Sequence, residues 1–110
     1  MIKLFKPRGF INFMQVKKQD RITKEKLTSY FKISQEALEE IKNNISKGRE
    51  KEASEILEMV ECYIKDAKFF QSKQDFVNAL SSLAYAYGWI DCGARLKIFN
   101  VNNKKLFTSD

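Results

Sequence analysis

The chain has 110 residues, of which 44% are hydrophobic and 31% are charged, and its formal net charge is +6. This length fits one domain with one core, and the composition excludes the disordered and fibrous classes. No apolar run approaches the ~20 residues that cross a bilayer, and charges interrupt the first residues before a secretory core could form. We therefore expect a cytoplasmic protein with no membrane span.

Residues 1–19 form a basic leader that carries most of the excess charge. Its five cations are accompanied by no acid, whereas residues 20–110 hold 15 basic and 14 acidic side chains; the cations are Lys3, Lys6, Arg8, Lys17 and Lys18. Basic and aromatic residues alternate in the leader as they do in segments that bind RNA or an anionic membrane surface. The same leader could instead dock its phenylalanines on the folded body or contact a partner protein, and the sequence leaves these alternatives open.

The first predicted helix covers about residues 20–45. The positions of its inner face recur at steps of three and four, which is the period of an amphipathic helix; they are Leu27, Tyr30, Phe31, Ser34, Leu38, Ile41 and Ile45. Thr23 and Asp20 are equal candidates for the N-cap. Gly48 is predicted to end this helix, because glycine adopts the left-handed conformation at low cost.

The second predicted helix covers about residues 50–72 and has the cleanest amphipathic pattern in the chain. Its apolar stripe consists of Ala53, Ile56, Leu57, Val60, Tyr63, Ile64, Ala67 and Phe70. Five acidic residues, Glu50, Glu52, Glu55, Glu58 and Glu61, are interpreted as solvated helix surface, and the absence of histidine argues against a metal site there.

The third predicted helix covers about residues 76–97, with Asp75 as its N-cap. Its core face consists of Phe76, Ala79, Leu80, Leu83, Ala84, Tyr87, Ile90, Ala94 and Ile98. The link before it is so short that the second and third helices must be antiparallel neighbours. The predicted fold is all-α, an antiparallel three-helix bundle over residues 20–98, with the leader (1–19) and a C-terminal tail (99–110) packed on its outside.

A second apolar stripe lies on the far side of the third helix, at Tyr85, Trp89, Cys92 and Leu96. Two other helices cannot cover both faces, and a helix that is apolar all round is normally enclosed. The candidates to cover the stripe are the leader, the tail, a second copy of the chain or a foreign partner. Ala84, Gly88 and Gly93 are predicted close-packing positions, since each glycine costs ~1 kcal/mol against alanine inside a helix.

No catalytic or cofactor signature is present in the sequence. The chain contains no histidine, which removes the commonest general base and the usual zinc ligand, and it lacks a glycine-rich phosphate loop. Asp91 and Arg95 are four residues apart toward the core face, where they could form an ion pair, bond a tyrosine or anchor a polar ligand. Cys62 and Cys92 are expected to be free, buried thiols, too few for a cysteine zinc site. Cys62 falls off the apolar stripe of the second helix, however, where it is either exposed or covered by a tail. We expect no enzyme activity, no cofactor and no metal.

The run "CYIKDAKFFQSKQDFVNALSSLAYAYGWIDCGARLKIFNV" and the later "LF" resemble an archaeal family, domain-of-unknown-function family 357. The matching segments are Asp66 to Phe70, Asp75 to Leu80, Ala84 to Leu96, and Leu106 with Phe107. The resemblance implies a small closed three-helix bundle with no assigned activity, to which the leader is an addition.

These observations favour a non-catalytic binding or assembly module that acts through the stripe at Tyr85, Trp89, Cys92 and Leu96, with Asp91 and Arg95 as a polar anchor. Its partner would be another protein or a second copy of the chain. The alternative is a protein that binds RNA or DNA through the basic leader.

Overall fold

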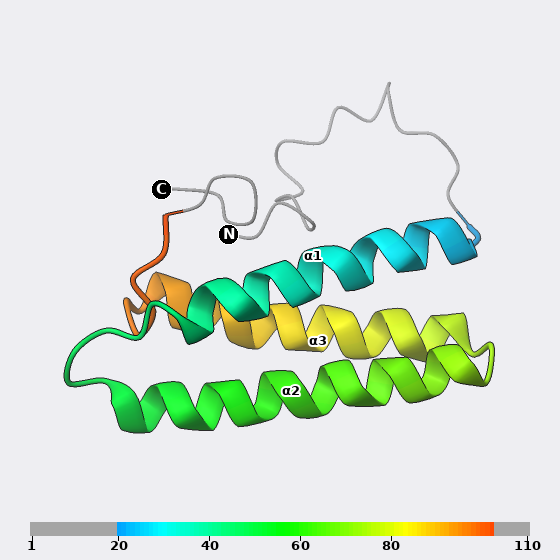
Figure 1. Cartoon of the computed structure of the whole chain (residues 1–110). Helices are drawn as coiled ribbons and strands as arrows, with labels where there is room; N and C mark the ends of the chain where they lie inside the picture. The colour runs from blue at the N-terminus through cyan, green and yellow to red at the C-terminus, as the bar shows by residue number, and fades with distance from the viewer. Residues whose placement is uncertain (1–19, 103–110) are drawn as a thin grey trace.

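The computed structural model describes residues 20–102, which form three α-helices and no strand. They are α1 (Lys24–Lys42), α2 (Glu50–Ser72) and α3 (Phe76–Arg95), and each helix runs opposite to the one before it (Figure 1). The all-α three-helix bundle predicted from the periodicity is therefore confirmed. The predicted packing of the leader and of residues 103–110 lies outside the described residues.

Side-chain caps fix where two of the helices begin. The backbone N–H of Lys26 donates to Thr23 Oγ1 at 3.1 Å, and that of Asn78 donates to Asp75 Oδ1 at 3.1 Å. Each cap satisfies an amide that the first turn would otherwise leave without an acceptor. Thr23, and not Asp20, is thus the N-cap of α1, so this helix begins later than predicted.

The first helix also ends earlier than the sequence suggests. It stops at Lys42, and Asn43 is its C-cap, so Ile45 lies in the link to α2. Gly48 has a φ of 86° in that link, before α2 begins. The left-handed conformation expected of this glycine is present, but it turns the chain into α2 instead of ending α1.

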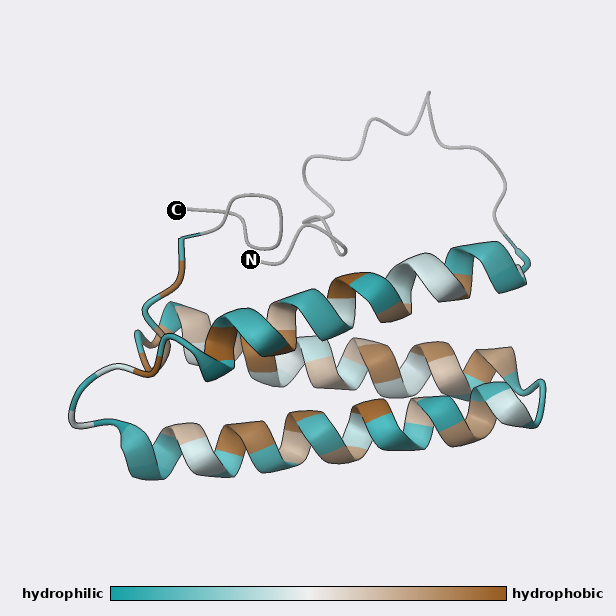
Figure 2. Cartoon of the chain, in the orientation of Figure 1, coloured by the Kyte–Doolittle hydropathy of each residue, from teal (hydrophilic) through white to brown (hydrophobic). Residues whose placement is uncertain are grey.

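The core lies where the three helices meet, and α3 runs between the other two (Figure 1). The helix α3 contacts both α1 and α2 extensively, whereas α1 and α2 contact each other at few positions. In Figure 2, α1 and α2 alternate between hydrophilic and hydrophobic positions, while α3 shows little of the hydrophilic colour. The fully buried side chains include Leu27, Ala37, Ile41, Ala53, Val60, Ala67, Ala79, Leu83, Ala86 and Ile90.

The chain turns sharply after α3 and returns to the core. The helix ends at Arg95, two residues before the predicted end, and Lys97 adopts a φ of 61°. This turn places Ile98 at 4% exposure and Phe99 at 0%. The prediction that the tail from residue 99 lies outside the bundle is therefore wrong for Phe99, which is a core residue.

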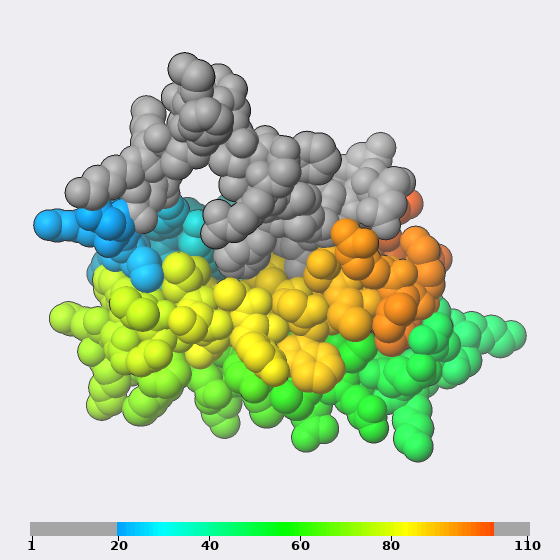
Figure 3. Space-filling view, turned by 180° about the vertical axis from the view of Figure 1, so that it is seen from behind, coloured from blue at the N-terminus to red at the C-terminus, as the bar shows by residue number. Residues whose placement is uncertain are grey.

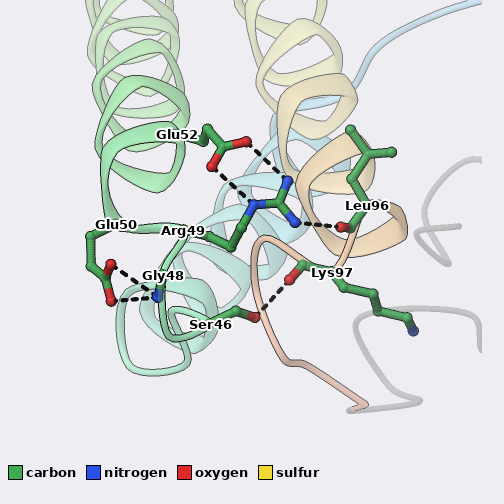
Figure 4. A network of polar contacts seen from close by, with 7 residues as sticks. All are labelled: Ser46, Gly48, Arg49, Glu50, Glu52, Leu96 and Lys97. Carbon is green, nitrogen blue, oxygen red and sulfur yellow. Dashed lines mark hydrogen bonds and ion pairs between the residues drawn. The ribbon is translucent and has the colours of Figure 1, made fainter.

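Hydrogen bonds fasten the α1–α2 link to the segment after α3, and we call these contacts, between residues 44–49 and 96–100, the link–tail junction (Figure 4). Ser46 donates its N–H to Ile98 O at 2.9 Å and its hydroxyl to Lys97 O at 2.6 Å. Arg49 donates from Nη1 to Leu96 O at 3.3 Å and is held by two hydrogen bonds to the Glu52 carboxylate. These contacts hold the segment that carries Phe99 against the end of the bundle.

Candidate functional site

The outer face of α3 is apolar and is covered by none of the described residues. Tyr85 and Leu96 are 54% and 57% exposed, and Cys92 is also exposed. Trp89 is half-buried and packs against the edge of the core. Figure 3, seen from behind, brings α3 to the front between α1 and α2. The predicted stripe is thus a real surface feature, but the element expected to cover it is not among residues 20–102.

An open hollow lies in the middle of this face. It is lined by Ala84, Tyr85, Gly88 and Trp89 and has a volume of about 330 Å³. Tyr85 forms one wall because its ring leans on Tyr63 of α2, with the ring centroids 4.5 Å apart at 43°. The hollow exists because two small residues one turn apart, Ala84 and Gly88, are flanked by two large aromatic side chains.

The two glycines of α3 have different surroundings. A Cβ at Gly93 would lie 2.5 Å from one carbon of the Phe99 ring and 2.7 Å from another, so Gly93 is a close-packing position, as predicted. A Cβ at Gly88 would meet no described atom within 4 Å, and Gly88 is exposed. Nothing among the described residues accounts for a glycine at position 88.

Asp91 and Arg95 form the ion pair that their spacing predicts, with Arg95 Nε 3.6 Å from Asp91 Oδ2. The Asp91 side chain is 27% exposed and its Oδ1 is buried, so Asp91 lies partly toward the core, as predicted. The Arg95 side chain is 49% exposed, so the prediction that it lies toward the core face is wrong. Counted at 100° per residue, they fall at the edge of the buried arc. A pair this exposed contributes only about 0.3 kcal/mol to stability, and its use as a ligand anchor stays a prediction.

Both cysteines are free, as predicted, but both are exposed, so the expectation of buried thiols is wrong. Cys62 lies on the outer side of α2, and Cys92 lies on the outer side of α3. The core consists mostly of alanine, leucine and isoleucine side chains, and neither cysteine is part of it.

The buried polar groups of the bundle lie between α1 and α3. Ser34 is fully buried and donates its hydroxyl to Tyr30 O at 2.8 Å, one turn earlier in α1. Tyr87 is 2% exposed, and burial raises the pKa of its hydroxyl above the ordinary value, with the neighbouring Ser34 hydroxyl partly offsetting that effect. The phenol therefore stays neutral in the core at ordinary pH.

Residues 20–102 contain no cluster of three or more side chains suited to hold a metal ion. None of the helices described for this chain has both the length and the apolar content to pass through a membrane. The predicted cations of the leader, Lys3, Lys6, Arg8, Lys17 and Lys18, lie outside the described range.

The fold and this surface define a small all-α bundle protein whose last helix presents an open apolar face. Residues 29–99 match the model of a family described as "Protein of unknown function (DUF357)", and the chain belongs to that family. The matched range contains all of α2 and α3, most of α1 and the buried Phe99. No curated protein and no solved structure matches the chain.

Proposed function

We propose that this protein is a non-catalytic assembly module that forms a homodimer through the outer face of α3. The observation that carries the proposal is Gly88. A glycine inside a helix costs about 1 kcal/mol relative to alanine, and no described neighbour needs the space that a Cβ would fill. Another helix that packs its backbone closely against α3 at position 88 would need that space.

The charge of the face favours a second copy over a charged partner. Within α3 itself, the only charged side chains are Asp91 and Arg95, and they pair with each other. In a two-fold interface the same patch meets itself, so an uncharged patch brings no like-charge repulsion. The reciprocal contact would place an aromatic side chain of each copy, such as Trp89, over the hollow of the other.

The area of the outer face of α3 limits the expected affinity of the homodimer. A helix of 20 residues is ~30 Å long and ~10 Å wide, so α3 alone offers ~300 Å². Stable interfaces bury about 800 Å² per partner. We therefore expect a weak dimer with a Kd in the micromolar range or above.

Sedimentation velocity over a concentration series tests the proposal. The full chain should shift from monomer to dimer as its concentration rises, and Gly88→Leu should stay monomeric because its side chain fills the hollow. Leucine is a good helix former, so this variant keeps the fold, as circular dichroism would verify. Phe69→Ser is the control, since it removes an apolar side chain that is 57% exposed but lies on α2, away from the proposed interface. A chain that stays monomeric to millimolar concentration, or a dimer that Gly88→Leu leaves intact, would refute the proposal.

A second candidate function is nucleic-acid binding through the basic leader, and the uneven charge favours it. Residues 1–19 carry five cations and no acid, while the rest of the chain is nearly neutral. An RNA gel shift that weakens steeply with salt, and that is lost when Lys3, Lys6 and Arg8 are changed to glutamine, would support this function. Absence of a shift at low salt would exclude it.

A further inference from the structure

A second groove lies on another side of the bundle, along α2 and beside the α1–α2 link. It has a volume of about 540 Å³ and is lined by Ile45, Glu50, Ser54, Leu57, Glu58, Glu61 and Cys62. The α2 members recur every three or four residues, so they form one continuous side of the helix over three turns. The groove therefore differs from the hollow of α3 in both place and chemistry.

The lining of this groove is amphipathic. Ile45, which is 37% exposed, and the half-buried Leu57 provide apolar surface. Glu50, Glu58 and Glu61 place three carboxylates along the same side. The Glu61 carboxylate lies 3.9 Å from Lys42 Nζ, and the Glu50 carboxylate accepts from the Gly48 N–H at 3.1 Å. The Glu58 side chain has neither a hydrogen bond nor an ion pair with the described residues.

We propose that this groove binds a positively charged peptide segment that carries large apolar side chains. The carboxylates would pair with its cations, and Ile45 with Leu57 would take its apolar side chains. A nucleic acid or an acidic segment would be repelled by the same carboxylates. A metal ion is disfavoured, because the described residues hold no ligand cluster for one.

The chain's own leader has the chemistry that the groove requires, and a leader supplied by a second copy is therefore a suitable occupant. It combines five cations with leucine, isoleucine and phenylalanine side chains and has no acid. In an extended segment at ~3.3 Å per residue, Lys3 to Arg8 spans ~17 Å. Along α2 at ~1.5 Å per residue, Glu50 to Glu61 also spans ~17 Å. The leader's cations and the carboxylates of the groove therefore extend over similar lengths.

The two exposed thiols allow a direct test, since Cys62 lines the groove and Cys92 lies on the outer face of α3. The probe is a synthetic peptide with the sequence of residues 1–19, added to the full chain at low salt. The rate of maleimide labelling at each cysteine is read by mass spectrometry. The peptide should slow labelling of Cys62 and leave Cys92 unchanged. Dimerisation through α3 would instead slow labelling of Cys92 as the protein concentration rises, so the two proposals fail separately.

Charge-reversal variants make the test specific. Glu58→Lys should weaken protection of Cys62 by the peptide about three- to tenfold. Glu55→Lys is the matched control, because Glu55 is exposed on α2 but does not line the groove, and it should have little effect. In the chain that carries both Glu58→Lys and Glu61→Lys, a peptide with its lysines and arginine replaced by glutamate should restore protection. Failure of both peptides to protect Cys62, or equal effects of Glu58→Lys and Glu55→Lys, would overturn the proposal.

Discussion

Replacing each α3 glycine by alanine should shift stability in opposite directions. At Gly88 the added methyl meets no described atom within 4 Å apart from the backbone of its own helix, so only the helix propensity changes. Gly88→Ala should raise the free energy of unfolding of the monomer by about 0.5–1 kcal/mol, because alanine loses less backbone entropy on folding.

At Gly93 the same methyl would collide with a ring that has little room to move. Its Cβ would lie 2.5 Å and 2.7 Å from two Phe99 carbons and 3.3 Å from Ile56 Cδ1. Phe99 is held from both sides, since Ile98 N donates to Gly93 O at 2.9 Å and Asn100 N donates to Asn44 O at 2.7 Å. Overpacking of this kind costs about 1–3 kcal/mol, which exceeds the gain in propensity. Gly93→Ala should therefore lower stability by about 1–2 kcal/mol.

Urea unfolding followed by circular dichroism measures both changes, at a concentration at which the chain is monomeric. For a domain of this size, 1 kcal/mol corresponds to about 4–8 °C in Tm, so the two variants should separate clearly in a thermal scan as well. A destabilised Gly88→Ala monomer would mean that a neighbour within the chain needs the space at position 88. A neutral or stabilised Gly93→Ala would mean that Phe99 does not pack there. Either result would refute this account of α3.

Three further changes test the core and the caps. Phe99→Ala should cost about 3–5 kcal/mol in urea unfolding, because the ring is fully buried, and a loss below 1 kcal/mol would contradict its place in the core. Asp75→Ala should cost about 1 kcal/mol through loss of the α3 cap, and Asp75→Asn should recover most of it. Burial raises the pKa of Tyr87 in the folded chain. Its neutral phenol therefore contributes fully to folding stability below the ordinary tyrosine pKa of about 10, and this contribution is lost as the pH rises through the raised pKa. In an alkaline absorbance titration one of the four tyrosines should therefore ionise only as the chain unfolds, and Tyr87→Phe should abolish that step; four tyrosines that titrate together would argue against burial.

Much of the bundle could be predicted from local pattern alone. The period of the apolar residues predicted all three helices, and the predicted range of α2, about residues 50–72, agrees with the structure. Capping is a local interaction, so the sequence already indicated Asp75 and proposed Thr23. The stripe at Tyr85 and Leu96 also followed from spacing, because the angle between residues on a helix does not depend on what surrounds it.

The remaining features depend on contacts between distant residues. Ile45 and Ile98 fit the helical periods, but the backbone around them pairs across the bundle, with Ile45 bridging to Phe99. No local pattern predicts that pairing. The predicted α1 and α3 were therefore too long, and Phe99 was predicted to lie outside the bundle. The one signal of this packing in the sequence was Gly93. A glycine lowers the stability of a helix, so its presence indicated a close neighbour, but not which residue that is. For Gly88 the same reasoning predicts a close neighbour, and none of the described residues is that neighbour.

The unequal contacts among the helices also predict the order in which parts of the molecule open. Since α1 touches α2 at few positions, it is held mainly by α3 and by the link–tail junction. The α2–α3 hairpin can thus persist while α1 separates, which requires loss of the α1–α3 packing together with the Ser46 and Asn100 hydrogen bonds. In native-state hydrogen exchange, the amides of α1 should lose protection as one cooperative unit before those of the hairpin.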